Sequence, residues 1–467
     1  MNKYLLPWLL FLFFTGFLSC KKESYINSPE ARLSTSVDTV KFDTVFTSVG
    51  SISQSFKIFN NNAQKLRLSS VKLMGGAASP FKINVNGMAA VQLDDINIAA
   101  NDSIYIFVTV SVNPGAANLP YLLTDSIQVI FNGNTRFIQL EAYGQNATFL
   151  KNITLTSDTT FTKNQPYVIL GVLKVSSGVT VTFEAGARLF FHANAGVLVE
   201  GSLVSTGTLD EPVICTGDRL DEPYNKFPAS WTGISFSPGS RDNNLTYTII
   251  KNASQALVVL KPAASGNPKL VLHQCTIYNA KDAALLCEGS NVAADNCLFY
   301  NSGSDLVVKN GGTYSFTNCT LAGYSNNYLS HTAPVAKLAN FLDMNGVFTS
   351  NALTALFKNC IFWGESGIVE NEITVEKEGA ASCAVTLDHC LYKASTDPLN
   401  SSILSSIKNL DPEFDSIDVR NNFYNFRITK SSLSPVISAG TPSTFLRDLD
   451  FFTRNPVKPD IGSYEKH

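Results

Sequence analysis

A loop in the middle of the chain carries the densest group of side chains that could do chemistry. Residues 217–227 contain Asp218, Asp221 and Glu222, together with Arg219 and Lys226. Carboxylate oxygens are the ligands that Ca²⁺ prefers, and a base beside a basic group can abstract a proton from a sugar acid. The loop lacks the residue order of a known calcium loop. It is therefore a candidate site, to be weighed against the commoner case of a solvated loop with no function.

Three aromatic residues, Tyr278, Tyr300 and Trp363, recur at equivalent positions of similar short segments, each directly after an apolar residue. Neighbouring residues on a strand point to opposite faces, so the rings lie outside if the apolar residues lie inside. Rings exposed in register can stack on the faces of sugars. The three residues are therefore candidate glycan contacts. Ala322 and Lys393 interrupt the file at the same position, and loops that cover the rings are the competing interpretation.

The same segments form an internal repeat that begins with cysteine, at Cys275, Cys297, Cys319, Cys360 and Cys390, and the first two intervals are 22 residues. A fixed period predicts a solenoid whose turns stack as parallel strands about 4.8 Å apart. Alternation turns these cysteines inward, farther apart than the roughly 3.8 Å between Cβ atoms that a disulfide prefers. We therefore expect buried free thiols. No Cys-x-x-Cys spacing exists and the five histidines are scattered, so we expect no zinc site.

Asparagine recurs at the corner after three copies of the repeat, as Asn252, Asn279 and Asn301. Amides stacked on successive turns can bond to one another, so we expect an asparagine ladder. Asp388 and His389 precede the last cysteine of the repeat. Because neighbours on a strand point apart, we do not expect these two side chains to act as a pair.

The rest of residues 148–467 consists of strands of three to five residues separated by glycine-containing corners, as in 167–178, 179–191 and 196–204. These segments, the strand 231–236 and the closing segment 459–465 resemble bacterial right-handed parallel β-helix proteins of the pectate-lyase-like fold. Several enzymes of that fold cut polysaccharides. The paired-Asp, Gly-His-Gly and Arg-Ile-Lys signatures of polygalacturonases and the Arg-x-Pro-x-x-Arg motif of pectate lyases are absent from the sequence.

Residues 36–147 have a different sequence pattern. About seven short segments of alternating apolar and polar residues are separated by turns, which predicts a β-sandwich. Asn132-Gly133-Asn134 between two apolar runs is a strong hairpin signal. Three stretches, 46–60, 100–114 and 138–147, resemble hydin-type immunoglobulin-like domains. We therefore expect an all-β chain, with an N-terminal immunoglobulin-like β-sandwich followed by a right-handed parallel β-helix solenoid.

The composition excludes one class of partner. The chain is 45% hydrophobic and only 16% charged, with a net charge of −3. A protein that binds nucleic acid carries a basic surface, which this balance does not provide. We expect neither DNA nor RNA as a partner.

The N-terminal sequence is typical of an export signal. A positive start and an apolar run of about 14 residues, too short to span a membrane, end at Ser19-Cys20. This resembles the lipobox of lipoproteins of the Bacteroidota type, which implies a signal peptide over 1–19 and a lipid on Cys20. Residues 20–35 then form a polar tether. We expect an outer-membrane lipoprotein of the cell envelope, on the surface or the periplasmic face.

Two functions stay open from the sequence. The anchor and the missing catalytic signatures favour a non-catalytic binding or adhesive platform, whose partner is a polysaccharide or another envelope protein. The alternative is a carbohydrate-active enzyme, a polysaccharide lyase or glycoside hydrolase. We expect no cofactor, with calcium at Asp218, Asp221 and Glu222 as the one metal to test.

Overall fold

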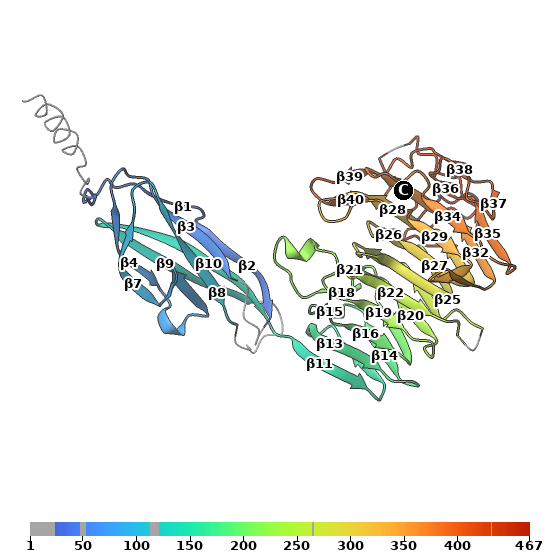
Figure 1. Cartoon of the computed structure of the whole chain (residues 1–467), viewed down its shortest axis with the longest axis horizontal. Coiled ribbons are helices and arrows are strands. Elements are labelled where there is room, and N and C mark those ends of the chain that lie inside the picture. The colour runs from blue at the N-terminus through green and yellow to red at the C-terminus, as the bar shows by residue number, and fades with distance from the viewer. Residues whose placement is uncertain (1–23, 47–52, 113–120, 264–265, 431) are drawn as a thin grey trace, which may run out of the picture. The chain divides into compact units, whose positions relative to one another are not determined.

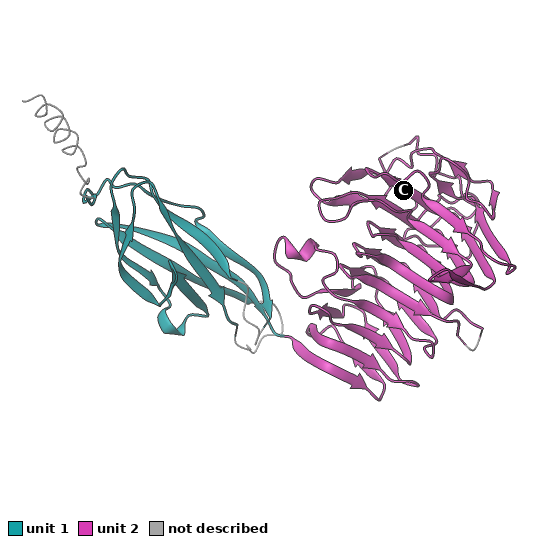
Figure 2. Cartoon of the chain, in the orientation of Figure 1, with its two compact units in different colours: residues 1–146 teal, residues 147–467 magenta. Residues whose placement is uncertain are grey.

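The computed structural model describes residues 24–46, 53–112, 121–263, 266–430 and 432–467. It is built of β-strands apart from two single-turn 3₁₀ helices, Gly76–Ala78 and Tyr224–Lys226. The chain divides into two compact units, residues 1–146 and 147–467 (Figure 2). The expected signal peptide and Cys20 lie outside the described residues. Within the described ranges, no helix has the length and apolar character needed to cross a membrane.

The first unit is a sandwich of two five-stranded sheets. One sheet has the order β1 (Leu33–Thr35), β3 (Gln54–Asn60), β8 (Ser103–Val110), β5 (Phe81–Val85), β6 (Met88–Ala89). The other has the order β2 (Thr39–Phe46), β10 (Asn134–Gln145), β9 (Tyr121–Phe131), β4 (Leu66–Leu73), β7 (Gln92–Ile98). All pairs are antiparallel except β2–β10. Alternate residues of each strand face inward, as period-2 patterning requires, and form one apolar core.

The hairpin prediction in the sandwich is confirmed. β9 and β10 are joined through Asn132 and Gly133, both with positive φ (45° and 80°), as a tight hairpin turn needs. The described part of the stretch expected as a tether, residues 24–35, contributes to the sandwich instead. β1 starts at Leu33 and pairs with β3, and Tyr25 forms a bridge with Lys65.

The second unit is a parallel β-helix whose strands lie on three faces, and Figure 1 shows the strands stacked in rows. Face A contains β16 (Gly196–Val199), β19 (Gly233–Phe236), β22 (Gln255–Leu260), the first parts of β25 (Ala283–Asp295) and β27 (Leu306–Thr317), β29 (Ala336–Ala339) and β34 (Ile373–Glu376). Face B contains β12 (Thr159–Phe161), β14 (Thr180–Glu184), β17 (Ser202–Thr206), β20 (Asn243–Thr246), β23 (Leu270–His273), the second parts of β25 and β27, β32 (Leu353–Lys358), β35 (Cys383–Asp388) and β37 (Ser401–Leu404).

Face C positions the candidate site. It contains β15 (Arg188–Phe191), β18 (Val213–Gly217), β21 (Thr248–Lys251), β24 (Thr276–Tyr278), β26 (Leu298–Tyr300), β28 (Thr320–Tyr324), β33 (Ile361–Glu365), β36 (Leu391–Tyr392) and β38 (Ile407–Lys408). At the start of the helix, β11 (Thr148–Leu155) and β13 (Tyr167–Val175) each run through two faces. Two antiparallel hairpins stand outside the coils, β30 (Phe341–Met344) with β31 (Val347–Ser350) and β39 (Ser416–Asp418) with β40 (Phe423–Asn425).

The repeated cysteines lie inside the helix, as the alternation predicts. All five are buried and free, so the prediction of buried free thiols is confirmed for them. Their side chains bond weakly to the preceding coil: Cys297 Sγ donates to Leu272 O at 3.6 Å, and Cys275 N donates to Cys297 Sγ at 3.4 Å. Burial raises the pKa of Cys297, Cys319 and Cys360 well above the ordinary value. These thiols are therefore packing residues rather than nucleophiles.

The corner that precedes face C carries a second ladder, which the sequence reasoning missed. The residue before each repeated cysteine has a positive φ of 49–55°, in Gln274, Asn296, Asn318, Asn359 and His389. Asn318 Nδ2 donates to Asn296 Oδ1 at 3.3 Å, and Asn359 Nδ2 donates to Asn318 Oδ1 at 2.9 Å. Asparagine suits this place because it adopts left-handed backbone at low cost. It is the residue type that both ladders share.

The same backbone corrects the expectation for Asp388 and His389. Their side chains are hydrogen-bonded, with 2.7 Å between His389 Nδ1 and Asp388 Oδ1. His389 has φ 51°, so it sits in the corner and not on the strand. Alternation fails where the backbone leaves the extended region, because the side-chain direction then changes.

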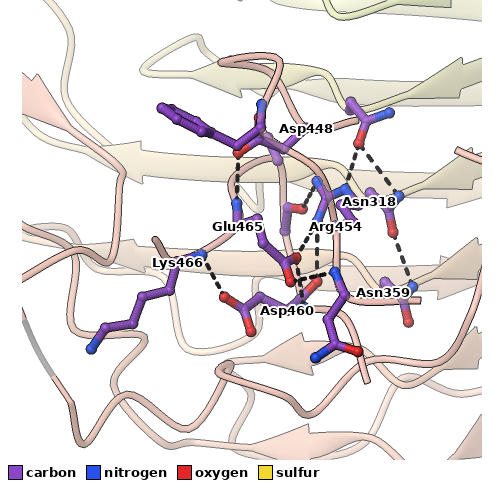
Figure 3. A network of polar contacts seen from close by, with 12 residues as sticks. Asn318, Asn359, Asp448, Arg454, Asp460, Glu465 and Lys466 are labelled. Carbon is purple, nitrogen blue, oxygen red and sulfur yellow. Dashed lines mark hydrogen bonds and ion pairs between the residues drawn. The ribbon is translucent and has the colours of Figure 1, made fainter. Parts of the chain in front are cut away.

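The described part of residues 409–467 adds no coil to the helix but lies along the outer surface of face C. Its apolar residues Phe426, Ile428, Val436, Leu449 and Ile461 are buried against outward side chains of that face, such as Leu298 and Ile361, in a separate core. Arg454 anchors this C-terminal cover (Figure 3). Its buried guanidinium donates to Asn296 Oδ1 at 3.0 Å, to Gly462 O at 2.8 Å and to Glu465 Oε2 at 3.4 Å.

Candidate functional site

A pocket of about 360 Å³ opens at the corner that follows face C, between the loop around Tyr224–Lys226 and the hairpin β39–β40. Both segments project from the same side of the β-helix (Figure 1). We call this cavity the Asn–Tyr pocket. Half of its lining residues are asparagines: Asn225, Asn252, Asn279, Asn301, Asn326 and Asn422. The others are Tyr278, Tyr300, Phe423, Tyr424, Lys226 and Lys251.

The asparagine ladder builds one wall of the pocket and holds the loop in place. Asn279 Nδ2 donates to Asn252 Oδ1 at 2.7 Å and to Lys226 O at 2.9 Å. Asn252 Nδ2 donates to Asn225 O at 2.7 Å. The predicted ladder is therefore present between Asn252 and Asn279. Its amides also fix the backbone of the loop, which brings two loop side chains to the pocket.

The prediction that Asn301 continues this ladder is wrong. Its Oδ1 accepts a hydrogen bond from Tyr324 N at 3.0 Å, and its side chain lies beside the Tyr424 hydroxyl. On the next two coils, the ladder position is taken by Gly323 and Gly364. A Cβ on either glycine would overlap the ring of His331, which enters from the excursion after β28. The ladder therefore ends at Asn279, and beyond Asn301 an imidazole occupies the space at the ladder position.

His331 is held there by a buried partner. Its Nε2 lies 2.8 Å from Glu372 Oε1, and both side chains are buried. Glu372 Oε2 also accepts a hydrogen bond from Val335 N at 3.3 Å. A buried acid that is paired with an imidazole and a backbone amide is internally satisfied. We therefore assign this pair to the structure of the excursion.

The predicted file of aromatic rings is present at Tyr278 and Tyr300, but other side chains cover much of it. Tyr278 and Tyr300 are stacked, with ring centroids 4.6 Å apart and an interplanar angle of 11°. Phe426 and Tyr424 pack on Tyr300 at 5.0 Å and 5.8 Å. Trp363 is only 5% exposed. The expectation that Trp363 is an exposed ring is wrong, because the C-terminal cover packs over face C. Tyr278 and Tyr300 reach the pocket, and their contact with glycan stays a prediction.

Asn225 Oδ1, Asn301 Nδ2 and Tyr424 Oη belong to lining residues of the pocket but are themselves buried, and the Tyr424 hydroxyl lies beside the amides of Asn301 and Asn326. Burial raises the pKa of Tyr424, and the adjacent amides of Asn326 and Asn301 oppose this shift. Its hydroxyl therefore stays protonated at neutral pH.

The carboxylates of the loop do not converge. Asp218 Oδ2 lies 2.7 Å from His192 Nδ1, and Arg219 donates two hydrogen bonds to Asp221 at 2.7 Å and 2.8 Å. Glu222 pairs with Lys226 at 3.0 Å. In the described ranges no three His, Cys, Asp or Glu residues are grouped so that they could hold a metal ion. The arrangement that a calcium site at Asp218, Asp221 and Glu222 requires is therefore absent from this loop.

The charged side chains in the pocket wall are basic. The lining contains two lysines, and none of the lining residues that the structure describes is Asp, Glu or His. Lys251 Nζ lies 5.9 Å from the centroid of the Tyr278 ring. Hydrolysis of a glycosidic bond needs two carboxyl groups beside the bond, and this wall supplies neither. Burial raises the pKa of Tyr300 well above its ordinary value, so its hydroxyl is a donor and not a base.

The sequence reasoning missed most of the polar wall. Asn225 lies in the loop 217–227 that was a candidate site from the sequence, but only the acidic and basic residues of that loop were considered. Lys251 directly precedes the first ladder asparagine, a position that could have been read from the repeat. Asn326, Asn422 and Tyr424 come from the excursion and from the C-terminal cover, where no periodicity marks them. Only their contacts with face C reveal them.

Comparisons with known proteins give little further guidance. No protein-family model matches the chain, and no curated protein matches it in sequence. Among solved structures, a family 123 glycoside hydrolase from Clostridium perfringens shares 12% identity, with 26% of each chain covered and a TM-score of 0.18. The VesB protease of Vibrio cholerae shares 17% identity, with 24% of this chain and 31% of that chain covered and a TM-score of 0.18. The chain thus spans less than a third of either protein, and likeness at this level supports no conclusion about function.

Proposed function

We propose that this protein is a lipid-anchored protein of the bacterial cell envelope that binds a polysaccharide, without cleaving it, in the Asn–Tyr pocket. One observation carries the proposal: the stacked rings of Tyr278 and Tyr300 border a cavity of about 360 Å³ whose lining is otherwise mostly asparagine. Sugars present hydroxyl groups that donate and accept hydrogen bonds, which amide side chains can match. Binding pockets typically combine aromatic surface with a few such polar groups.

Two physical arguments support sugar as the ligand. Aromatic rings such as those of Tyr278 and Tyr300 pack well against the apolar faces of sugars. The ladder holds the loop of Asn225 and Lys226 through backbone carbonyls. A wall fixed in this way is ordered before the ligand arrives, which lowers the entropic cost of binding.

The proposal also includes the cellular location of the protein and its membrane anchor. The N-terminal sequence supports export, a lipid on Cys20 and residence in the outer membrane. One lipid chain gives only marginal membrane binding, whereas several hold a protein firmly. With the chain anchored at its N-terminus, the β-helix is available to bind envelope or external glycan.

A glycan array with the purified full-length protein tests the proposal. Wild type should bind at least one polysaccharide class, and Tyr278→Ala should weaken that signal about tenfold, the loss of one stacked ring. Tyr143→Ala is the matched control, because that residue is an exposed tyrosine of the sandwich far from the pocket in sequence. Equal loss in both variants, or no binding to any class, would contradict the assignment.

The enzyme alternative has a specific basis and a separate test. Lys226 and Lys251 are the pocket groups that a lyase could use as a base or to neutralise a sugar acid. A lyase releases products with a new carbon–carbon double bond, which absorb in the ultraviolet, and a hydrolase releases reducing ends. Turnover of any bound polysaccharide that Lys251→Met abolishes would replace the binding proposal with the enzyme.

A further inference from the structure

We infer that the Asn–Tyr pocket selects anionic over neutral glycans, and that the ammonium group of Lys251 binds the negative charge of the sugar. This rests on the proposed glycan-binding function and names the class of polysaccharide. The anion is a carboxylate or a sulfate ester, since both present charged oxygen acceptors to an ammonium group.

Lys251 stands at one end of the file of aromatic rings. The strand register places Lys251 beside Tyr278 and Tyr278 beside Tyr300, on strands of face C about 4.8 Å apart. The Tyr278 ring is stacked on Tyr300, with centroids 4.6 Å apart, and Lys251 Nζ lies over the same ring at 5.9 Å from its centroid. A sugar that packs against Tyr278 therefore has an ammonium group within reach of its substituents.

Lys251 has no counter-charge in the part of the chain that the structure describes. Its side chain is half-buried and lines the pocket, but its Nζ makes no hydrogen bond or ion pair with any described residue. The basic side chains of the neighbouring loop are paired. Lys226 lies 3.0 Å from Glu222, and Arg219 donates to Asp221 at 2.7 Å. Among the described lining residues, the charge of Lys251 therefore remains for a ligand.

The outward side chains of face C from β15 to β26 carry positive charge only. They alternate with core residues such as Leu189, Cys215 and Ile250. The outward residues are Arg188, Phe190, Ile214, Thr216, Ile249, Lys251, Thr276, Tyr278, Leu298 and Tyr300. Arg188 is half-buried, like Lys251, and also has no printed partner within the described ranges. Two unbalanced cations on one stretch of face C attract an anionic chain and repel a cationic one.

Charge then decides between glycans of similar shape. A hydrogen bond from an ammonium group to an anion is about twice as strong as a bond between neutral groups. A neutral sugar offers Lys251 only hydroxyl groups, and an amino sugar is itself a cation. We therefore expect affinity to fall from acidic to neutral to amino polysaccharides.

Pairs of polysaccharides that differ only in charge test the inference. Calorimetry with full-length protein compares alginate and hyaluronate with their carboxyl-reduced forms, and a sulfated galactan with its desulfated form. The acidic member of a pair that binds should bind about tenfold more tightly, and the difference should shrink as NaCl is raised from about 0.05 to about 0.5 M. The carboxylate and sulfate pairs show which anion is preferred.

The outcomes separate this inference from the proposed function. Equal affinity within every pair that binds, or binding on the array confined to neutral glycans, would overturn the anion assignment and leave glycan binding standing. Binding of none of the polymers, nor of any glycan on the array, would overturn both.

Two substitutions at Lys251 locate the charge. Lys251→Met keeps an apolar stem beside Tyr278 and removes the ammonium group, so affinity for the acidic polymer should fall about tenfold, with less than a threefold change (about 0.6 kcal/mol) for its neutral partner. Lys251→Arg keeps the charge and should stay within about threefold of wild type. Lys309→Met removes an exposed lysine from face A and is the matched control. Equal losses in Lys251→Met and Lys309→Met would overturn the inference.

A third variant tests the inference by a gain of affinity. Glu222→Gln removes the carboxylate that lies 3.0 Å from Lys226, while its Oε1 can still accept the hydrogen bond from Asn225 Nδ2 at 3.2 Å. The released lysine should raise affinity for the acidic polymer about two- to threefold. A folding defect cannot produce such a gain. Weaker binding of the acidic polymer by this variant, at unchanged melting temperature, would count against an electrostatic role of the pocket.

Discussion

Asn279 donates from Nδ2 to Oδ1 of Asn252 on the preceding coil at 2.7 Å, and to the backbone oxygen of Lys226 at 2.9 Å. One side chain thus joins two coils of the solenoid and fixes the loop that contributes Asn225 and Lys226 to the pocket. The repeat and the candidate site are coupled through this contact. Changes to the ladder should therefore affect both stability and binding.

Asn279→Gly tests that coupling. The variant loses both hydrogen bonds but keeps the positive φ of 55° at no steric cost, so unfolding free energy should fall by about 1–3 kcal/mol. Glycan affinity should fall with it, because the loop is released. Asn279→Ala should be less stable than the glycine variant by about 1 kcal/mol, the cost of left-handed backbone for a residue with a Cβ. Denaturant melts measure both differences, and a more stable alanine variant would refute the account.

Arg454→Met should destabilise the C-terminal cover. The guanidinium is buried and bonds to Asn296, Gly462 and Glu465, so its loss leaves Glu465 without a cation and should cost about 3–5 kcal/mol. Burial raises the pKa of Glu465 and Asp448, because both carboxyl groups lie in a cluster that is largely shielded from solvent. Limited proteolysis should then cut first within the segment after Lys408. Arg447→Met, on an exposed arginine of the same segment, is the control and should melt like wild type.

Thiol labelling should separate the packing cysteines from the accessible one. Of the eight cysteines that the structure describes, Cys383 alone is partly exposed. Burial raises the pKa of Cys215 to about 12 and that of Cys297, Cys319 and Cys360 well above the ordinary value, so at about pH 8 these thiols remain protonated and covered. We expect native protein to react with a thiol reagent at Cys383, and Cys383→Ser to lose that reaction. Rapid labelling of Cys297 or Cys319 in native protein would show that the core is open.

The pair His273 and Asp295 should give stability that depends on pH. The hydrogen bond to Asp295 raises the pKa of His273. Because the folded-state pKa lies above the unfolded value, the contribution is complete below about pH 6.5 and is lost as pH rises through the folded-state pKa. With His273 a third exposed, the contribution should be about 1 kcal/mol. Wild type should exceed His273→Gln in melting temperature at about pH 6, and the gap should close by about pH 9. A gap that widens with pH would contradict this sign.

Cys20→Ala should release the protein from the membrane. If the sulfur of Cys20 carries diacylglycerol, the variant should lose incorporation of labelled fatty acid and should move from the membrane fraction to the soluble one. Cys383→Ser should keep both properties, since that residue lies within the β-helix. Unchanged labelling in Cys20→Ala would exclude the lipoprotein assignment.

The parts of the fold that rest on short-range periodicity were readable from the sequence. The cysteine repeat predicted the stacked coils, and alternation over two residues placed Cys275, Cys297 and their equivalents inside. The hairpin at Asn132 and Gly133 followed from turn chemistry. Each of these depends on residues close in sequence or related by a fixed interval. The same logic failed at His389, where one residue with positive φ reversed the direction of a side chain.

The sequence by itself therefore determined an all-β chain with a solenoid and the asparagines at its corners. Tertiary structure alone decided that the outer surface of face C is covered, that Trp363 is buried, and that Asn301 and Tyr424 border one cavity although 123 positions separate them (424 − 301). The reason is physical. Periodicity sets which way a side chain points, but whether it meets solvent depends on what packs over it. The segment that packs over face C has no sequence repeat from which its position could be predicted.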